Sequence, residues 1–359
     1  MTAVLLLAGL VALVAGAEAL VRGASKLALS FGISSLVVGL TIVAMGTSAP
    51  EVAVSVGAAT RGATDLAIGN VVGSNVLNVL FVLGASALVT PLLVAQQLIR
   101  QEVPLMIGAS VLLFVLALDR SISILDGMLL VTLLVAYTGF LIWQSRRANA
   151  EFNAEANSEI TTLTKGGWDD KLPAQLLLVS GGLGLLILGA DWFVQGAVRV
   201  AVSLGVSELV IGLTVVAFGT SLPEIVTSLL AAVRGERDMA VGNVIGSNIF
   251  NILGCLGLSA IVAPMGIGIT DAMLTFDLPV MIAVAVACLP IFFTGNLISR
   301  WEGAVFVAYY FAYTTYLILA AQQHEAIDTF GFVMSWVVMP LTTLTIAVIS
   351  YRHYRTAAP

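Results

Sequence analysis

The sequence predicts an all-α integral membrane protein that consists of two inverted five-helix repeats followed by an eleventh, C-terminal helix. Three observations predict this fold class. Hydrophobic residues make up 59% of the chain and charged residues only 10%, a composition typical of proteins that are embedded in a membrane. Apolar runs of membrane-spanning length recur along the chain, and the sequence matches itself when it is shifted by 173 positions, 46 onto 219.

Eleven apolar runs have the length of a transmembrane helix. Roughly 20 helical residues cross a hydrocarbon core of ~30 Å. The fourth and ninth runs are short, and the eleventh follows the second repeat. In order, the runs lie at 3–21, 36–59, 67–90, 103–118, 122–143, 173–194, 208–232, 240–263, 277–294, 301–320 and 329–350.

A polar stretch of mixed charge at 145–172 separates the two sets of apolar runs. Its low apolar content is typical of a solvated linker. We therefore expect a first membrane repeat at 1–145, a linker at 146–171, a second membrane repeat at 172–320, and an additional helix with a tail at 321–359.

The distribution of Lys and Arg predicts the orientation in the cell (inner) membrane. Under the eleven-span map, twelve basic residues fall on one side and three on the other, and the richer side is expected in the cytoplasm. The N-terminus is then outside, and the linker and C-terminus are cytoplasmic. The richer side holds Arg22, Lys26, Arg100, Arg146, Arg147, Lys165, Lys171, Arg234, Arg237, Arg300, Arg352 and Arg355, and the other side Arg61, Arg120 and Arg199.

Two motifs carry the internal repeat. "GTSAPEVAVSVG" at 46–57 aligns with "GTSLPEIVTSLL" at 219–230, and "GNVVGSNVLNVL" at 69–80 aligns with "GNVIGSNIFNIL" at 242–253, with eight of twelve positions identical in the second pair. Each repeat holds five spans, an odd number, so the second copy enters the membrane from the opposite side. Inverted repeats of this kind are common in secondary transporters, whose substrate sites lie near the midplane.

The first motif predicts a broken second helix, and its copy a broken seventh. Ser48 and Glu51 have the spacing of a capping box, and Pro50 removes a backbone donor, yet both lie inside an apolar run. We expect the chain to unwind near 45–48 and the helix to restart at Ser48, which caps it; Ser221 repeats the pattern. The alternative is an ordinary proline kink with a back-bonded serine.

Glu51 and Glu224 place one carboxylate per repeat in the middle of a span. A charge there costs at least ~2.5 kcal/mol, and such residues normally face a cavity and mark an ion path. The two should converge at the pseudo-two-fold axis. Their combined charge suits one divalent cation, or monovalent ions and protons in its place.

The second motif supplies neutral oxygens. At helical spacing Asn70, Ser74 and Asn78 share one face, as do Asn243, Ser247 and Asn251. Amide and hydroxyl oxygens are ligands that Ca²⁺ accepts. The glycines of the same motif also allow close helix packing, so packing is the alternative interpretation.

Other polar groups have open roles. Glu18 and Asp191 could snorkel or pair with Arg22, and Glu102 and Asp277 could be helix-start acids or ion-entry groups. Both histidines lie in a terminal loop and tail, which disfavours a histidine-ligated transition-metal site.

With these motifs the sequence resembles the Ca²⁺/cation antiporter superfamily, and within it the prokaryotic sodium/calcium exchangers, over roughly residues 1–320. The resemblance implies ten core helices, with ions bound between the second, third, seventh and eighth. It implies Glu51 and Glu224 as central Ca²⁺ ligands and carbonyls near Ala44 and Ala217 as contributors. The residues that would complete the Ca²⁺ and Na⁺ sites are Thr47, Ser48, Ser74 and Asn78 with Thr220, Ser221, Ser247 and Asn251.

Two features depart from the family pattern. Some members, including potassium-dependent exchangers, carry Asp at the position of Asn251; the amide leaves two central carboxylates and disfavours K⁺ co-transport. The eleventh span lies outside the ten-helix pattern.

We therefore expect an antiporter that exchanges Na⁺ for Ca²⁺ across the membrane by alternating access. The alternative is H⁺-coupled exchange of Ca²⁺ or another divalent cation, since a buried glutamate can also carry protons. An intramembrane hydrolase and a channel are weaker hypotheses. The expected partners are Ca²⁺ and Na⁺ as substrates and the surrounding lipid bilayer. We expect no enzyme activity, no cofactor beyond the transported ions, no bound nucleic acid and no obligatory protein partner.

Overall fold

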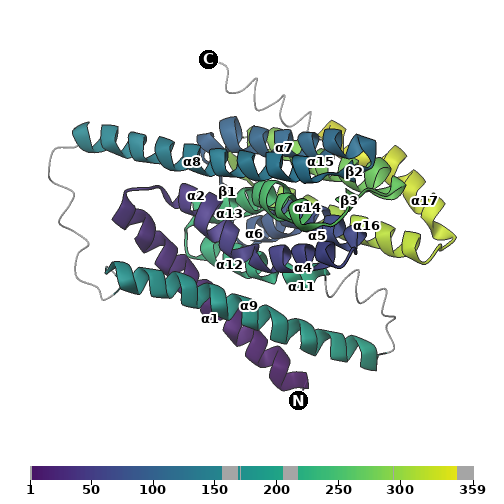
Figure 1. The fold of residues 1–359 in the computed structure, drawn as a ribbon, viewed down its shortest axis with the longest axis horizontal. Coiled ribbons are helices and arrows are strands. Elements are labelled where there is room, and N and C mark those ends of the chain that lie inside the picture. The colour runs from purple at the N-terminus through teal and green to yellow at the C-terminus, as the bar shows by residue number, and fades with distance from the viewer. Residues whose placement is uncertain (1, 156–168, 170, 205–216, 294, 346–359) are drawn as a thin grey trace.

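The computed structural model describes residues 2–155, 169, 171–204, 217–293 and 295–345. The described chain is almost entirely helical, as predicted, and is a multi-pass membrane protein (Figure 1). Within these ranges nine helical segments are long and apolar enough to span a membrane, and a bent pair, Ser35–Thr47 with Ala49–Thr60, makes a tenth. The predicted seventh span begins outside the described residues. The predicted eleventh span is the helical segment Ala326–Thr345.

The first half contains eight α-helices and two short strands. The helices are α1 (Thr2–Phe31), α2 (Ser35–Val38), α3 (Ala44–Thr47), α4 (Ala49–Thr60), α5 (Thr64–Leu77), α6 (Gly84–Val89), α7 (Val103–Leu116) and α8 (Ile124–Glu155), and the strands are β1 (Leu92–Leu93) and β2 (Ser121–Ile122). Turns of π-helix lie at Gly39–Val43, Asn78–Leu83 and Leu98–Glu102, and a 3₁₀ turn at Ala117–Asp119.

The second half repeats this order. Its described helices are α9 (Leu172–Ser203), α11 (Ala217–Thr220), α12 (Leu222–Val233), α13 (Arg237–Phe250), α14 (Gly257–Val262), α15 (Leu278–Phe293), α16 (Arg300–Ala321) and α17 (Ala326–Val333), and its strands are β3 (Ile267–Gly268) and β4 (Leu297–Ile298). Its π-helical turns are Asn251–Leu256, Met273–Asp277 and Met334–Val338.

The break in the second helix is a single residue. The helix continues through Thr47, Ser48 takes φ −80° and ψ 8°, and α4 begins at Ala49 with its axis bent by 46°. The predicted unwinding over 45–48 is wrong, because the Ser48 N–H bonds to Ala44 O and the Val52 N–H to Ser48 O, both at 3.1 Å. Helical hydrogen bonding therefore continues on both sides of the bend, as in the alternative proline kink. The second copy has the same arrangement, with Ser221 between α11 and α12.

Short strand pairs join the two repeats reciprocally. β1 pairs with β4, and β2 pairs with β3, both antiparallel. In each pair, a strand from the loop between the third and fourth spans of one repeat meets a strand from the loop between the fourth and fifth spans of the other repeat. The repeats are therefore connected at their loops as well as through their helices.

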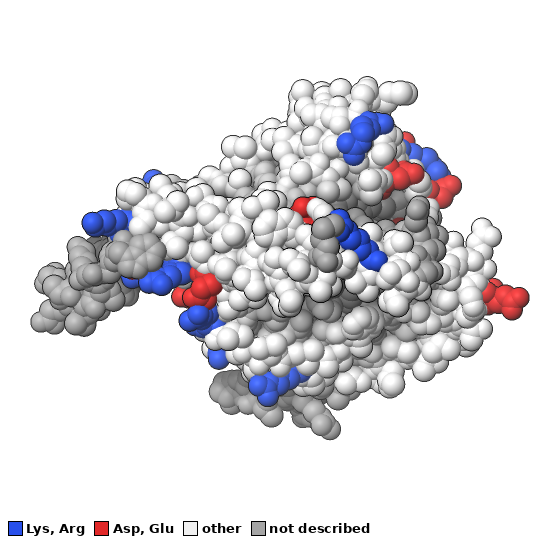
Figure 2. All heavy atoms as spheres, turned by 90° about the horizontal axis from the view of Figure 1, so that it is seen from below, with Lys and Arg blue, Asp and Glu red and all other residues white. Residues whose placement is uncertain are grey.

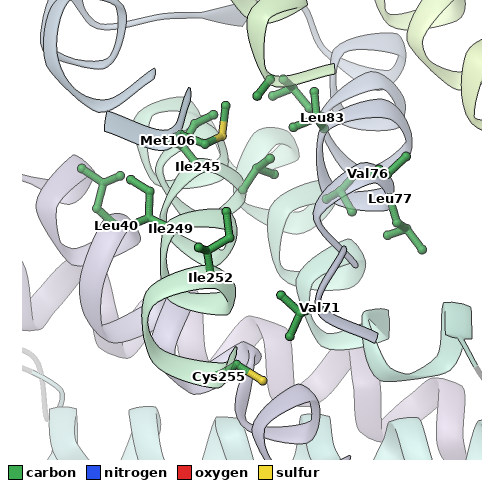
Figure 3. Packing of buried hydrophobic residues seen from close by; sticks show 14 of the residues in the cluster. Leu40, Val71, Val76, Leu77, Leu83, Met106, Ile245, Ile249, Ile252 and Cys255 are labelled. Atoms are coloured by element: carbon green, nitrogen blue, oxygen red, sulfur yellow. The ribbon is translucent and has the colours of Figure 1, made fainter. Parts of the chain in front are cut away.

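The third and eighth spans form the centre of the bundle. In their most apolar stretches 72% of the residues of Thr64–Val89 and 89% of those of Arg237–Val262 are buried. Leu40 and Met106 lie beside Ile245 and Ile249 of α13 (Figure 3). Because these two spans are enclosed by the others, polar side chains on them are removed from both lipid and bulk water.

α1 and α9 cross on one side of this core and pack closely on each other (Figure 1). The contact is made by glycines that recur every seven residues and occupy equivalent positions in the two repeats. Each lies against the backbone or a side chain of the opposite helix, and a Cβ on Gly16 would lie 2.7 Å from Gly182 O. Close approach of this kind is how small residues join transmembrane helices. The glycines are Gly9, Gly16 and Gly23 on α1 and Gly182, Gly189 and Gly196 on α9.

The surface is consistent with a lipid environment. Charged side chains are sparse on the face shown in Figure 2, and large hydrophobic side chains such as Leu7 and Val11 of α1 are exposed. In the second half of α1, Arg22 forms an ion pair of 2.7 Å with Asp169 near the end of the linker. The hydrogen bond from Arg22 holds the pKa of the Asp169 carboxyl below its usual range.

We predict that Gly182→Ala destabilises the protein and that Gly181→Ala does not. A Cβ on Gly182 would lie 2.6 Å from Leu20 N, whereas a Cβ on Gly181 meets nothing within 4 Å. Overpacking costs ~1–3 kcal/mol, while an unhindered Gly→Ala change in a helix gains roughly 0.5–1 kcal/mol. Thermal unfolding of the two variants in detergent measures the difference. Equal melting temperatures would contradict the close packing of α1 on α9.

Candidate cation site

The ten site residues expected from the sequence lie together where the two broken helices meet the third and eighth spans. Nine of them are buried, and Thr220 is partly exposed. Glu51 lies in the first turn of α4 and Glu224 in the first turn of α12, and neither side chain has any exposed surface. Each carboxylate therefore lies directly after the bend of its own repeat, in the first turn of the helix that follows.

Each carboxylate accepts a hydrogen bond from the serine at the bend of the other repeat. Ser48 Oγ donates to Glu224 Oε1 at 2.8 Å, and Ser221 Oγ donates to Glu51 Oε1 at 2.9 Å. The predicted helix caps are wrong, because neither serine side chain bonds to the backbone of the following helix. Continuous helical bonding and the proline leave few backbone donors to cap, so the hydroxyls are available to the opposite repeat.

The threonines before the bends also cross between the repeats. Thr47 Oγ1 lies 3.2 Å from Asn243 Oδ1, and Thr220 Oγ1 lies 3.5 Å from Asn70 Oδ1. The amide nitrogens of these asparagines donate to serines of their own repeat, Asn70 to Ser55 and Asn243 to Ser228, both at 2.9 Å. Asn70 and Asn243 therefore join helices with both ends of their amides, which differs from the ligand role expected from their helical face.

Asn78 and Asn251 begin π-helical turns, a feature that often marks functional positions. Asn78 Nδ2 donates to Asn248 Oδ1, and Asn251 Nδ2 donates to Asn75 Oδ1, both at 3.1 Å. The sequence analysis did not select Asn75 and Asn248. The signal was present, since both belong to the "GSN" that the two motifs share.

Several buried oxygens of this cluster have no hydrogen-bond donor among the described residues. They are Glu51 Oε2, Glu224 Oε2, Asn78 Oδ1, Asn251 Oδ1 and Ser247 Oγ. A buried acceptor without a partner costs ~1–3 kcal/mol, and more when it is charged. Two carboxylates, two amide oxygens and hydroxyls grouped in this way provide an all-oxygen environment for a hard cation.

Glu102 and Asp277 lie outside this cluster. Glu102 is buried at the end of a π-helical turn and accepts hydrogen bonds from Tyr137 Oη at 2.7 Å and from two glutamine side chains. Asp277 accepts one from Tyr313 Oη at 3.0 Å. Both acids precede a helix and bond to a tyrosine of the next span, which favours the helix-start interpretation over ion entry.

The fold and the paired carboxylates define a class: a multi-pass helical membrane transporter built from two repeats. The chain matches the model of the sodium/calcium exchanger protein family over residues 1–143 and 174–319. It belongs to this family.

Individual relatives cover about three quarters of the chain or more. The chain is 36% identical over 346 residues to the sodium/calcium exchanger MaX1 of Methanosarcina acetivorans, covering 87% of this chain and 97% of that one. It is 37% identical over 264 residues to the inner membrane protein YrbG of Escherichia coli, covering 74% and 81%. The structure of the sodium-calcium exchanger NCX_Mj soaked with 10 mM Na⁺ and 10 mM Sr²⁺ superimposes with a TM-score of 0.73 at 32% identity, covering 89% of this chain and 97% of that one.

We predict that Ser48→Ala couples energetically to Glu224→Gln more strongly than to Glu51→Gln. Removing the hydroxyl leaves Glu224 Oε1 without its donor, at a cost of ~1–3 kcal/mol, and part of this cost disappears when the carboxylate is removed. A double-mutant cycle on the free energy of unfolding, measured in detergent without Ca²⁺, gives both couplings. Equal couplings would contradict the cross-repeat bond.

Proposed function

We propose that this protein is an antiporter that exchanges Na⁺ for Ca²⁺ by alternating access. The observation that carries the proposal is the cluster of buried oxygens without donors, to which each repeat contributes one carboxylate and one amide. The sodium/calcium exchanger names of MaX1 and NCX_Mj support the same ions.

In the proposed site, Glu51 and Glu224 bind Ca²⁺ directly, and their two negative charges balance one divalent cation. Oxygens of Ser74, Ser247, Asn78 and Asn251 complete a set of the kind that Ca²⁺ accepts, roughly six to eight oxygens. Thr47, Ser48, Thr220 and Ser221 line the bends and contribute Na⁺ ligands. Na⁺ and Ca²⁺ compete for the same carboxylates, so the protein carries either ion but not both at full occupancy.

The ions are substrates, and the proposed function needs no catalytic cofactor, no enzyme chemistry and no protein partner. With an amide at Asn251 the site holds two carboxylates, which disfavours a bound K⁺ beside the other ions. Access alternates as the α1–α9 pair slides across the core, since the glycine contacts join these two helices to each other.

The proposed orientation follows the basic residues, with the N-terminus outside and the linker and C-terminus in the cytoplasm. The inner membrane is the proposed location, and the name of the relative YrbG supports it. Arg22 and Asp169 would then form their ion pair on the cytoplasmic side.

We predict that proteoliposomes loaded with Na⁺ take up Ca²⁺ when Na⁺ flows outward, and that Glu51→Gln and Glu224→Gln each abolish this uptake. Each substitution removes one of the two charges that balance Ca²⁺. Ca²⁺ uptake under outward Na⁺, K⁺ and H⁺ gradients is the measurement, and Asp328→Asn on the exposed surface of α17 is the control. Uptake driven only by the H⁺ gradient would replace Na⁺ coupling with the proton-coupled alternative. Uptake that survives both substitutions would exclude this site.

A further inference from the structure

Asn75 and Asn248 occupy equivalent positions in the two repeats and bind to each other's backbone. Asn75 Nδ2 donates to Asn248 O at 3.2 Å, and Asn248 Nδ2 donates to Asn75 O at 3.3 Å. Both side chains are buried, with 2% of their surface exposed. A backbone carbonyl can only accept, so these bonds determine which end of each amide is nitrogen.

The orientation passes from this pair to the neighbouring asparagines. With their nitrogens on the backbone, Asn75 and Asn248 present Oδ1 as an acceptor, and Asn251 and Asn78 each donate Nδ2 to it at 3.1 Å. The oxygens of Asn78 and Asn251 are left without a donor among the residues that the structure describes. An asparagine amide turned the other way would offer N–H groups, which a cation repels.

We propose that Asn75 and Asn248 are positioning residues that hold the Asn78 and Asn251 amides with their oxygens toward the transported cation. The proposal rests on the proposed function, since it assumes that the cation binds at this cluster. It assigns the two asparagines no contact with the ion. Because the repeats exchange the bonds, each positioning residue acts on the amide of the opposite repeat.

The test compares Asn75→Leu and Asn248→Leu with Asn248→Asp and with Ser110→Ala. Leucine fills the space without an acceptor, aspartate keeps an oxygen for Asn78 Nδ2, and Ser110→Ala removes another buried polar group whose hydroxyl bonds only to Met106 O. We expect the leucine variants to raise the KM for Ca²⁺ about tenfold with a smaller change in the maximal exchange rate. Asn248→Asp should restore part of the affinity, and Ser110→Ala should leave KM unchanged.

If the wild-type protein exchanges Na⁺ for Ca²⁺ and both leucine variants have an unchanged KM for Ca²⁺, the positioning role is overturned. If the leucine variants fold poorly, unchanged Ca²⁺ affinity in their remaining folded fraction would also overturn the positioning role, as would an affinity loss in Asn248→Asp as large as in Asn248→Leu. Absence of exchange in the wild type would instead contradict the proposed function. Ca²⁺-dependent thermal stabilisation supplies a second affinity readout that does not depend on transport.

A separate observation concerns access to the site. α1 packs along α12, whereas the equivalent contact of α9 on α4 is nearly absent in the described structure. On α12, Leu222 and Ile225 are buried, with 7% and 5% exposed, while their counterparts on α4, Ala49 and Val52, are partly exposed. In the described structure α12 is thus covered by α1, whereas the equivalent helix α4 is not covered by α9 and is partly exposed.

An ion pair follows the same asymmetry. Glu18 of α1 pairs with Arg234 at the end of α12, at 2.6 Å. Their counterparts by repeat are Asp191 and Arg61, which form no ion pair in the described structure; Asp191 instead accepts a hydrogen bond from Gln195. The ion pair is therefore formed beside the covered helix α12, whereas beside α4 the two equivalent residues are present but not paired with each other in the described structure.

We infer that Glu18–Arg234 and Asp191–Arg61 are alternating latches, one closed in each access state. When the α1–α9 pair slides, α1 leaves α12 as α9 covers α4, so one ion pair opens as the other closes. This second proposal also rests on the proposed exchange by alternating access. In the proposed orientation the structure is closed toward the cytoplasm and open toward the outside.

Val52→Cys on α4 and Ile225→Cys on α12 report the two access states through the reactivity of each thiol toward a water-soluble reagent. In a Cys255→Ala/Cys288→Ala background, we expect Glu18→Gln to lower the ratio of thiol reactivity at 52 to that at 225, and Asp191→Asn to raise it. Because an exposed ion pair contributes little free energy, we expect each substitution to change this reactivity ratio by about two- to fivefold. The exchanged pair Glu18→Arg/Arg234→Glu should restore the wild-type ratio.

Shifts in the same direction, or none, would overturn the latches. The labelling requires no transport, so it separates failure of the latches from failure of the proposed exchange. Thermal unfolding of Glu18→Gln and Asp191→Asn shows whether either variant has changed the ratio by destabilising the protein.

Discussion

The structure depends on the burial of two carboxylates in the middle of a membrane protein. Glu51 and Glu224 have no exposed surface and no basic residue bonded to them among the described residues. Each accepts a hydrogen bond from a serine of the opposite repeat, and its second oxygen has no donor in the described part of the chain. An uncompensated buried charge is expensive. The arrangement is therefore stable only when a bound metal cation balances the two carboxylates or when protons neutralise them.

That requirement explains how the surrounding polar groups are arranged. Serines, threonines and asparagines around the carboxylates donate hydrogen bonds to one another, and the oxygens left without a donor among the described residues are those available to a cation. The packing serves the same end. α5 and α13 carry the network at the centre of the bundle, where the surrounding spans exclude lipid, while the glycine contacts between α1 and α9 lie at the edge of the core.

Much of this could be predicted from the sequence. The apolar runs and the 173-residue repeat predict the spans. The costly acids and repeated motifs indicate the site, and the family resemblance that they carry implies the ten candidate residues. Local patterns failed where a longer-range partner decided the outcome. Ser48 has the spacing of a cap, but its backbone donors are already used and a carboxylate from a distant segment is available. Asn75 and Asn248 differ from the other motif residues only in the partners that the fold provides, and no spacing rule distinguishes an amide that faces an ion from one that orients it. The π-helical turns at Asn78 and Asn251 likewise carry no sequence mark that we could identify.

The reciprocity of the hydrogen bonds has a consequence for the history of the chain. Ser48 completes Glu224, Ser221 completes Glu51, and the asparagine bonds cross in the same way. Half of the polypeptide therefore contains every type of group that the site needs, but none of the bonds that cross between the repeats. A protein with a single copy of the repeat could assemble the same centre only by pairing with a second molecule inserted in the opposite orientation, and the linker makes that antiparallel pair permanent within one chain.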